Sequence, residues 1–269
     1  MKIAFLGGGN MANALVGGML AKGFDPRSVS VIELSPAARD RIAAHGVRVS
    51  TAPDAAAAEA DTLVIAVKPQ DLRSALAGIS TDLRQKLVVS IAAGVRLEAL
   101  SRWLGGHRRL VRCMPNTPAL VGAGITGLYA LPEVGAEDRR KAESILAAVG
   151  EVVWLSDERL IDPVTAVSAS GPAYVFWLIE QLAAYAEQAG IPREDALRLA
   201  RHCVFGAAKL ALESDLPPAD LRRNVTSKGG TTEAALNIFA QEKLAERFAR
   251  ALEAATRRGA ELGDSLGKD

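Results

Sequence analysis

The sequence predicts an α/β protein, with an N-terminal doubly wound parallel sheet followed by an all-helical C-terminal domain. Short apolar runs alternate with helical stretches over the first 157 residues, which is typical of βαβ units around buried parallel strands. A glycine cluster, Gly7–Gly9, directly follows the first apolar run. From Asp162 onward no segment has the pattern of a strand. These three observations set the boundary between the two domains near residue 157.

The expected elements of the N-terminal domain follow one another closely. Six apolar runs are predicted strands: Lys2–Leu6, Val29–Ile32, Thr62–Val67, Leu87–Ile91, Leu110–Cys113 and Val152–Leu155. The clearest helices are Asn10–Lys22, which Gly23 ends, and Ala37–His45, which Gly46 ends. We therefore predict a dinucleotide-binding type of sheet domain over residues 1–157.

The C-terminal region, residues 158–269, is predicted to be entirely helical. Tyr174–Ile179 is an uninterrupted apolar run, and the apolar residues continue at helical spacing to Tyr185. Such a helix must be buried on nearly all sides. A second helix is expected over Arg193–Glu213 and a last one from about Glu233 to Leu262. Because so few residues cannot cover this helix alone, we expect a dimer built on the C-terminal domain.

Composition and charge exclude several classes of function. The chain has 269 residues, of which 49% are apolar and 23% charged, and a net charge of +1, so no nucleic-acid or membrane partner is expected. No run approaches the ~18 apolar residues of a membrane span, and the N-terminus lacks the apolar stretch of a signal peptide. Cys113 and Cys203 form no ligand pattern with the three histidines. We expect a cytoplasmic protein without a metal site.

The segment Gly7-Gly8-Gly9-Asn10-Met11-Ala12 fits the pattern G-x-G-x-x-G/A between a predicted strand and a predicted helix. Gly7 permits the tight turn, Gly9 lets the backbone approach a pyrophosphate, and Ala12 allows close packing of helix on strand. The helix N-terminus offers free N–H groups to the phosphates. The alternative is a glycine-rich turn without a ligand. The position favours a Rossmann-type nucleotide site.

Glu33 ends the second predicted strand, 24 positions after Gly9. A carboxylate there can bind the adenosine ribose hydroxyls and repel a 2′-phosphate, which favours NAD. Arg39 can instead meet a 2′-phosphate. The alternative is that both residues are solvated surface charges.

Two further loops follow predicted strands, where ligands bind in open α/β sheets. One is Ala66-Val67-Lys68-Pro69 and the other contains Ala92 and Ala93. Their small residues leave room for a ribose and a nicotinamide. For Lys68, an ordinary surface lysine is the alternative.

The stretch from Asn224 to Glu233 joins hydroxyl residues to a Gly-Gly pair just before a helix. Thr231 or Thr232 is a natural N-cap, and a simple cap is the structural alternative. A cap needs one hydroxyl, whereas this stretch has four together with Gly229 and Gly230. Free N–H groups at a positive helix end suit a small carboxylate.

These motifs together resemble the pyrroline-5-carboxylate reductase family in order and spacing. The matching segments are Gly7–Ala12, Ala66–Gln70, Ser90–Gly94, Arg112–Ala119, Ser168–Tyr174 and Asn224–Thr232, and the last is the most specific. The resemblance implies hydride transfer from NADPH to the imine carbon of 1-pyrroline-5-carboxylate, which gives L-proline. It also implies a Rossmann domain, a helical dimerisation and substrate-binding domain over 158–269, a homodimer, and often a decamer of five dimers.

Residue roles follow from the resemblance by position. The implied cofactor contacts are Leu6, Gly7, Gly8, Gly9, Asn10, Met11, Ala66, Val67, Lys68, Pro69, Ala92, Ala93 and Asn224, to which Glu33 is added from its strand-end position. The implied substrate contacts are Ser227, Gly229, Gly230, Thr231 and Thr232, with Thr232 as the catalytic group at the ring nitrogen.

Two departures from the family pattern leave the use of NADH open beside NADPH. Pro53 replaces an Asn that contacts the adenosine half in some relatives, and Leu34 replaces a basic residue for the 2′-phosphate. Two other classes compete with this interpretation. The first is another imine- or β-hydroxyacid-type dehydrogenase with the same two-domain plan. The hydroxyacid enzymes carry a Lys on the long helix, and none occurs from Ser168 to Gly190. A dinucleotide-sensing regulator would leave Ser227–Thr232 unexplained.

Overall fold

The computed structural model describes residues 1–53, 55–79 and 82–268. The chain forms two compact units: Met1–Ser170 together with Ala255–Asp269, and Gly171–Ala254. Residues 158–170 and the C-terminal segment thus group with the sheet, whereas the sequence-based division stands at 157/158. Each unit is described separately below.

The first unit contains one eight-stranded sheet in the order β3-β2-β1-β4-β5-β6-β7-β8. The strands are β1 Ile3–Leu6, β2 Val29–Ile32, β3 Arg48–Ser50, β4 Thr62–Ile65, β5 Leu87–Ser90, β6 Leu110–Met114, β7 Gly124–Ala130 and β8 Gly150–Trp154. β1 to β6 pair in parallel, and β7 runs antiparallel to β6. The chain order reverses at β1, which lies between β2 and β4.

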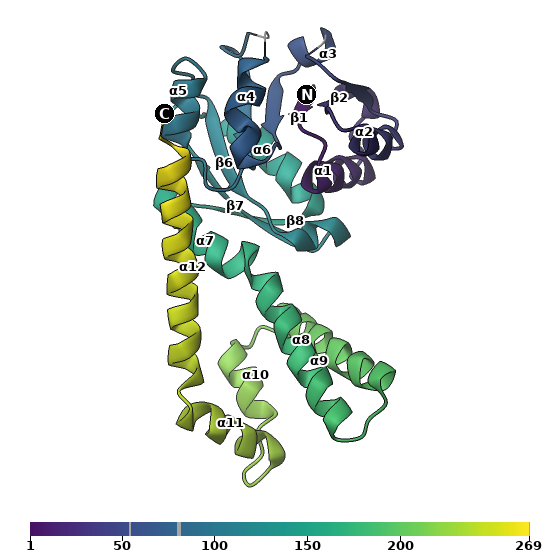
Figure 1. Cartoon of the computed structure of the whole chain (residues 1–269), viewed down its shortest axis with the longest axis vertical. Coiled ribbons are helices and arrows are strands. Elements are labelled where there is room, and N and C mark those ends of the chain that lie inside the picture. The colour runs from purple at the N-terminus through teal and green to yellow at the C-terminus, as the bar shows by residue number, and fades with distance from the viewer. Residues whose placement is uncertain (54, 80–81, 269) are drawn as a thin grey trace. The chain divides into compact units, whose positions relative to one another are not determined.

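Helices cover both faces of this sheet, as expected for a doubly wound fold (Figure 1). They are α1 Asn10–Ala21, α2 Pro36–Ala43, α3 Ala55–Ala58, α4 Leu72–Ala77, α5 Leu97–Trp103, α6 Ala136–Leu146 and the short α7 Ile161–Val164. One core packs α1 and α6 against Phe5, Val31 and Val89. The other packs α4 and α5 against Leu6, Ile65 and Val88. Alternate strand residues therefore face different cores, as the pleat requires.

All six predicted strands are present, and two strands were not predicted. β3 has three residues with partly exposed side chains, so no apolar run marks it. β7 contains two glycines, Gly124 and Gly127, which strands normally avoid. At Gly127 a Cβ would lie 2.8 Å from Val164 Cγ1, so the glycine allows α7 to approach the strand.

The second unit consists of α8 Gly171–Gln188, α9 Arg193–Glu213, α10 Pro218–Asn224, α11 Thr231–Gln241 and the first part of α12 Leu244–Leu266. The prediction of one final helix over Glu233–Leu262 is wrong. Lys243 has φ +52° and separates α11 from α12. No glycine or proline signals this break, so the helical spacing continues across it. In the described part of the chain, no helix combines the length and apolarity needed to span a membrane.

Candidate functional site

The predicted cofactor residues of the first unit gather at the carboxyl edge of the sheet. Ile32, Leu6, Ile65 and Ser90 are register partners across four neighbouring strands. Glu33, Gly7, Ala66 and the Ile91–Ala93 segment directly follow these four residues. They therefore lie side by side where the strand order reverses, which is where open α/β sheets bind ligands.

The loop after β1 has the geometry of a phosphate-binding turn. Gly7 has φ +101°, and a Cβ there would lie 2.7 Å from Ala66 O, so only glycine fits. Gly9 is the N-cap of α1 and has no side-chain cap, and no atom lies within 4 Å of the position of its Cβ. The N-terminus of α1 is therefore open for a pyrophosphate to approach its free N–H groups.

Glu33 is fixed to this loop by both carboxylate oxygens. Oε2 accepts from the Gly8 N–H at 2.6 Å, and Oε1 accepts from the Ser35 N–H at 2.7 Å. Arg39 Nη1 donates to Leu34 O at 2.6 Å. Leu34 itself is 76% exposed. The end of β2 thus presents a carboxylate beside the glycine loop and a guanidinium one helical turn away.

The remaining predicted cofactor residues of this unit differ in exposure. Ala92 is buried, and its N–H lies 3.3 Å from Ser90 Oγ. Ala93 and Lys68 are exposed, and Ala66, Val67 and Pro69 are half-buried. Lys68 precedes the short 3-10 helix η2, Pro69–Asp71, in extended backbone. Among the described residues its ammonium makes no hydrogen bond, so the side chain is available to a ligand.

In the second unit, the predicted substrate residues form the turn Ser227–Gly230 and the first two residues of α11. Gly229 has φ +73°, and a Cβ on Gly230 would lie 2.4 Å from Ser227 Oγ. The Gly230 N–H donates to Ser227 O at 3.0 Å, and the Gly229 N–H donates to Glu233 Oε2 at 2.7 Å. The left-handed backbone at Gly229 therefore favours glycine, whereas at Gly230 a side chain would require the Ser227 hydroxyl to move.

The expectation that Thr231 or Thr232 caps α11 is wrong. Gly230 is the N-cap, and no side chain caps the helix there. Thr231 and Thr232 are the first two residues of the helix, with Thr232 partly buried. Within the described chain neither hydroxyl makes a hydrogen bond. The turn thus offers free helix-start N–H groups and two unused hydroxyls, which suits a small carboxylate and a polar ring atom. Asn224 ends α10, and its side chain is exposed.

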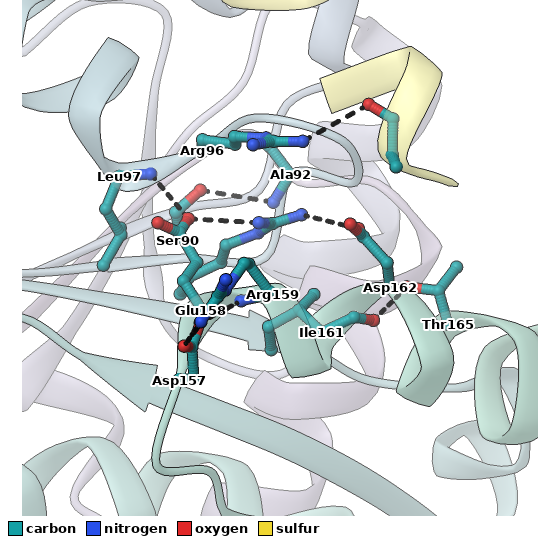
Figure 2. A network of polar contacts seen from close by, with 12 residues as sticks. Ser90, Ala92, Arg96, Leu97, Asp157, Glu158, Arg159, Ile161, Asp162 and Thr165 are labelled. Atoms are coloured by element: carbon teal, nitrogen blue, oxygen red, sulfur yellow. Dashed lines mark hydrogen bonds and ion pairs between the residues drawn. The ribbon is translucent and has the colours of Figure 1, made fainter. Parts of the chain in front are cut away.

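A buried ion-pair network in the first unit was missed from the sequence (Figure 2). Arg112 lies in β6 with a side chain only 4% exposed, and its Nη1 donates to Glu158 Oε1 at 3.0 Å. Arg112 Nη2 lies 3.9 Å from Asp162 Oδ1. The usable signal was an arginine inside an apolar strand run, because a buried charge needs a partner. The partner itself, 46 positions away, has no sequence signature.

The other missed residue is Asn116, which is buried after β6. Its Nδ2 donates to Ser168 O at 3.2 Å, and its Oδ1 accepts from the Ile125 N–H at 2.9 Å. It therefore joins the proline-rich loop to β7 and to the π-helical turn Thr165–Ala169.

Cys113 lies in β6, where burial raises the pKa of its thiol, so no thiolate is available there.

Comparison with known proteins identifies two matching family models. Residues 158–262 match the family described as pyrroline-5-carboxylate reductase dimerisation. Residues 2–94 match the family described as NADP oxidoreductase coenzyme F420-dependent. The second match includes the glycine loop, Glu33, Ala66–Pro69 and Ala92–Ala93.

Several pyrroline-5-carboxylate reductases match nearly the whole chain. The pyrroline-5-carboxylate reductase of Pseudomonas aeruginosa is 44% identical over 99% of this chain and 98% of its own length. A pyrroline-5-carboxylate reductase structure from Coxiella burnetii is 41% identical, covers 97% of this chain and 98% of that chain, and has a TM-score of 0.90. The Plasmodium falciparum pyrroline carboxylate reductase with NADP bound is 28% identical over 98% of both chains, with a TM-score of 0.85.

Proposed function

We infer that this chain, which belongs to the pyrroline-5-carboxylate reductase family, reduces 1-pyrroline-5-carboxylate to L-proline with NADPH. The observation that carries this conclusion is the 44% identity over 99% of the chain, which includes both glycine turns. It makes the protein an oxidoreductase of proline biosynthesis. A β-hydroxyacid dehydrogenase finds no support, because α8 from Gly171 to Gln188 has no lysine.

For the cofactor, the proposed contacts are the residues of the carboxyl edge. The open backbone at Gly9 and the start of α1 suit the pyrophosphate. Leu6–Met11 and Ala66–Pro69 would line the dinucleotide, and Ala92, Ala93 and Asn224 its nicotinamide half. Arg39 is the candidate partner of a 2′-phosphate, since only its Nη1 is used within the described residues. Glu33 lies close enough to the loop to accept ribose hydroxyls, so we propose that NADH is also used.

For the substrate, the proposed site is the turn Ser227–Thr232. The N–H groups at the start of α11 would hold the carboxylate, with Gly229 and Gly230 giving the ligand access to the backbone. The Thr232 hydroxyl would then lie at the ring nitrogen, because it has no partner within the described chain. The hydroxyl oxygen can accept the N–H of a protonated imine and so orient the ring.

The chemistry needs orientation more than acid catalysis. The nicotinamide supplies a hydride when it is bound. As the hydride reaches the imine carbon, the C=N π electrons move to nitrogen, which keeps its proton and becomes an amine. Because a protonated imine is already electrophilic, Thr232 has to place the nitrogen rather than protonate it strongly. Holding the two reacting atoms in contact is the main contribution of the protein.

The assembly is at least a dimer through the C-terminal region, because residues 158–262 match a dimerisation family. In the isolated chain, α8 exposes Phe176 and Trp177, each about 60%, as well as Tyr185. We propose that a partner chain covers this face in a homodimer, and that dimers assemble further into a decamer. A cytoplasmic location without nucleic-acid or membrane partners is part of the same proposal.

The direct test is oxidation of NADPH on addition of 1-pyrroline-5-carboxylate, followed at 340 nm, with proline identified as the product. The expected result is stoichiometric consumption of both reactants. Oxidation of NADPH with a 3-oxo or 2-oxo acid but not with the cyclic imine would contradict the proposed substrate.

A further inference from the structure

We propose that Glu158 is a positioning residue for hydride transfer, which together with Arg112 and Arg96 fixes the loop 91–96 beside the nicotinamide. The inference rests on the proposed function, because the role of Ala92 and Ala93 at the nicotinamide is part of that proposal. None of the three side chains belongs to the proposed cofactor or substrate contacts.

The first end of the loop is fixed by the sheet. Ser90 ends β5 and is the register partner of Arg112 in β6. Its hydroxyl lies 3.3 Å from the Ala92 N–H, and both residues are buried. Gly94, with φ +74°, then turns the chain toward α5. The exposed Ala93 between them is the part of the loop that a ligand can reach.

The second end is fixed by Glu158. α5 begins at Leu97. Its N-cap residue is Arg96, whose side chain has no acceptor atom and so cannot cap the helix. Instead, the Leu97 N–H donates to Glu158 Oε1 at 2.8 Å (Figure 2). Glu158 is the first residue of the 3-10 helix η5, Glu158–Leu160. A carboxylate at a helix N-terminus is also favoured by the helix dipole.

The same oxygen that holds Leu97 is held by Arg112. Arg112 Nη1 donates to Glu158 Oε1 at 3.0 Å, with 4% of the guanidinium side chain and 21% of the glutamate side chain exposed. A buried cation without a partner is strongly unfavourable, so separating the pair would cost a large amount of free energy. Arg112 therefore restricts the carboxylate to the one position from which it reaches α5.

On the other side, the end of α12 holds the loop. Arg96 Nη2 lies 2.8 Å from Asp264 Oδ1 and 3.5 Å from Ala260 O. A Cβ on Gly263 would lie 2.9 Å from Arg96 Nε, so a larger residue at this position would collide with the guanidinium. Leu266 and Leu262 pack against Gly94. The loop is thus fixed from both sides, by Glu158 and by α12.

This arrangement predicts a specific defect when it is removed. Displacement of the loop by about 1 Å would move the nicotinamide relative to the imine and lower kcat by about ten- to a hundredfold. The pyrophosphate and adenosine would still bind at Gly7–Gly9 and β2. A cofactor fragment without nicotinamide, 2′-phospho-ADP-ribose, should therefore bind as tightly as to the parent, whereas NADPH should bind more weakly.

The experiment compares four variants by kcat, by melting temperature and by titration with NADPH and with the fragment. Glu158→Gln keeps an oxygen acceptor for Leu97 and for Arg112, whose guanidinium still faces the Asp162 carboxylate at 3.9 Å, so kcat should stay within about threefold of the parent. The double variant Arg112→Met/Glu158→Met removes the buried cation together with the acceptor for Leu97, and Asp162 loses its 3.9 Å contact with Arg112. Arg96→Ala removes the contact with α12 from a partly exposed position. Both should show the defect in kcat with unchanged affinity for the fragment.

Glu98→Ala is the matched control. Glu98 is another carboxylate in the first turn of α5, but its side chain is 87% exposed and lies 3.9 Å from Arg102. It should leave kcat and both affinities unchanged.

The proposal is overturned if the double variant and Arg96→Ala both turn over like the parent, or if Glu158→Gln loses as much activity as the double variant. If the double variant does not fold, Arg96→Ala decides by itself. A parent enzyme inactive on the imine contradicts the proposed function instead, and the two titrations still report on the loop.

Discussion

The Glu33 carboxylate accepts a hydrogen bond from the Gly8 N–H at 2.6 Å, so the residue that ends β2 is joined to the loop that follows β1. Its second oxygen accepts from the Ser35 N–H. The carboxylate therefore has a structural role as well as the proposed contact with ribose hydroxyls. Substitutions at Glu33 will affect the shape of the loop and the choice of cofactor together.

Cofactor preference should move toward NADPH in Glu33→Ser/Leu34→Arg, because a repelling carboxylate is removed and a phosphate partner is added.

Arg39→Ala should do the opposite and lower kcat/KM for NADPH, with NADH little affected. A hydrogen bond to a charged group contributes ~1.5–3 kcal/mol, so the expected loss is about ten- to a hundredfold. Steady-state kinetics with both cofactors measure it. Arg41→Ala, in the same helix, is the control, and an equal loss there would point to a general charge effect.

Gly9→Val should abolish tight cofactor binding without unfolding the protein. The Cβ that valine adds has no protein atom within 4 Å and φ is −66°, so we expect the fold to tolerate it, but the side chain occupies the approach of the pyrophosphate. Gly7→Val is the contrasting variant, because its φ is +101° and its Cβ would overlap Ala66. It should be less stable by at least ~1–3 kcal/mol. Calorimetric titration and thermal melting separate the two effects, and normal NADPH affinity in Gly9→Val would refute the assigned phosphate site.

Thr232→Val should lower kcat/KM by about ten- to a hundredfold, through the loss of a hydrogen bond to a charged ligand of ~1.5–3 kcal/mol. Its stability should change by less than ~0.5 kcal/mol, since Gly230 and not Thr232 is the N-cap. Thr226→Val is the control for a structural hydroxyl, because Thr226 Oγ1 donates to Arg222 O at 2.6 Å. That variant should melt earlier and retain turnover. Early melting with normal turnover in Thr232→Val would place the substrate elsewhere.

The homodimer should depend on the apolar face of α8. Phe176→Asp/Trp177→Asp places two charges on side chains that are 60% and 59% exposed in the isolated chain. The double variant should sediment as a monomer at micromolar concentration, whereas the parent should not. Glu180→Asp, an exposed position of the same helix, should leave the assembly intact. A parent protein that is a stable monomer would contradict the proposed interface.

The elements that the sequence predicted well are those with a local cause. Strands β1, β2, β4 and β5 are buried along their whole length between two layers of helices, which favours short apolar runs. β8 is partly exposed, and its apolar run was recognisable from the β-branched residues Val152 and Val153. The glycine turns were recognisable because Gly7 and Gly229 need positive φ. Local chemistry therefore predicted the fold class and the two binding loops.

What could not be predicted depends on contacts between distant residues. The break at Lys243 interrupts a segment without glycine or proline, so no local residue type marks it. β7 contains glycines because α7 approaches Gly127 closely, which no local rule anticipates. The pairing of Arg112 with Glu158 and the use of Gly230 as N-cap likewise depend on the folded chain.

The docking of the C-terminal segment on the sheet unit has a consequence for biosynthesis. Arg96 and Arg102 make hydrogen bonds to Ala260 and Gly267, partners 164 and 165 residues later in the chain. On the ribosome, the strands and glycine loop emerge long before these partners are translated. A nascent chain can thus acquire its nucleotide pocket early, whereas the loop 91–96 gains its contacts with α12 after the last helix has been translated. Ribosome-stalled intermediates should accordingly bind the dinucleotide before they can turn over substrate.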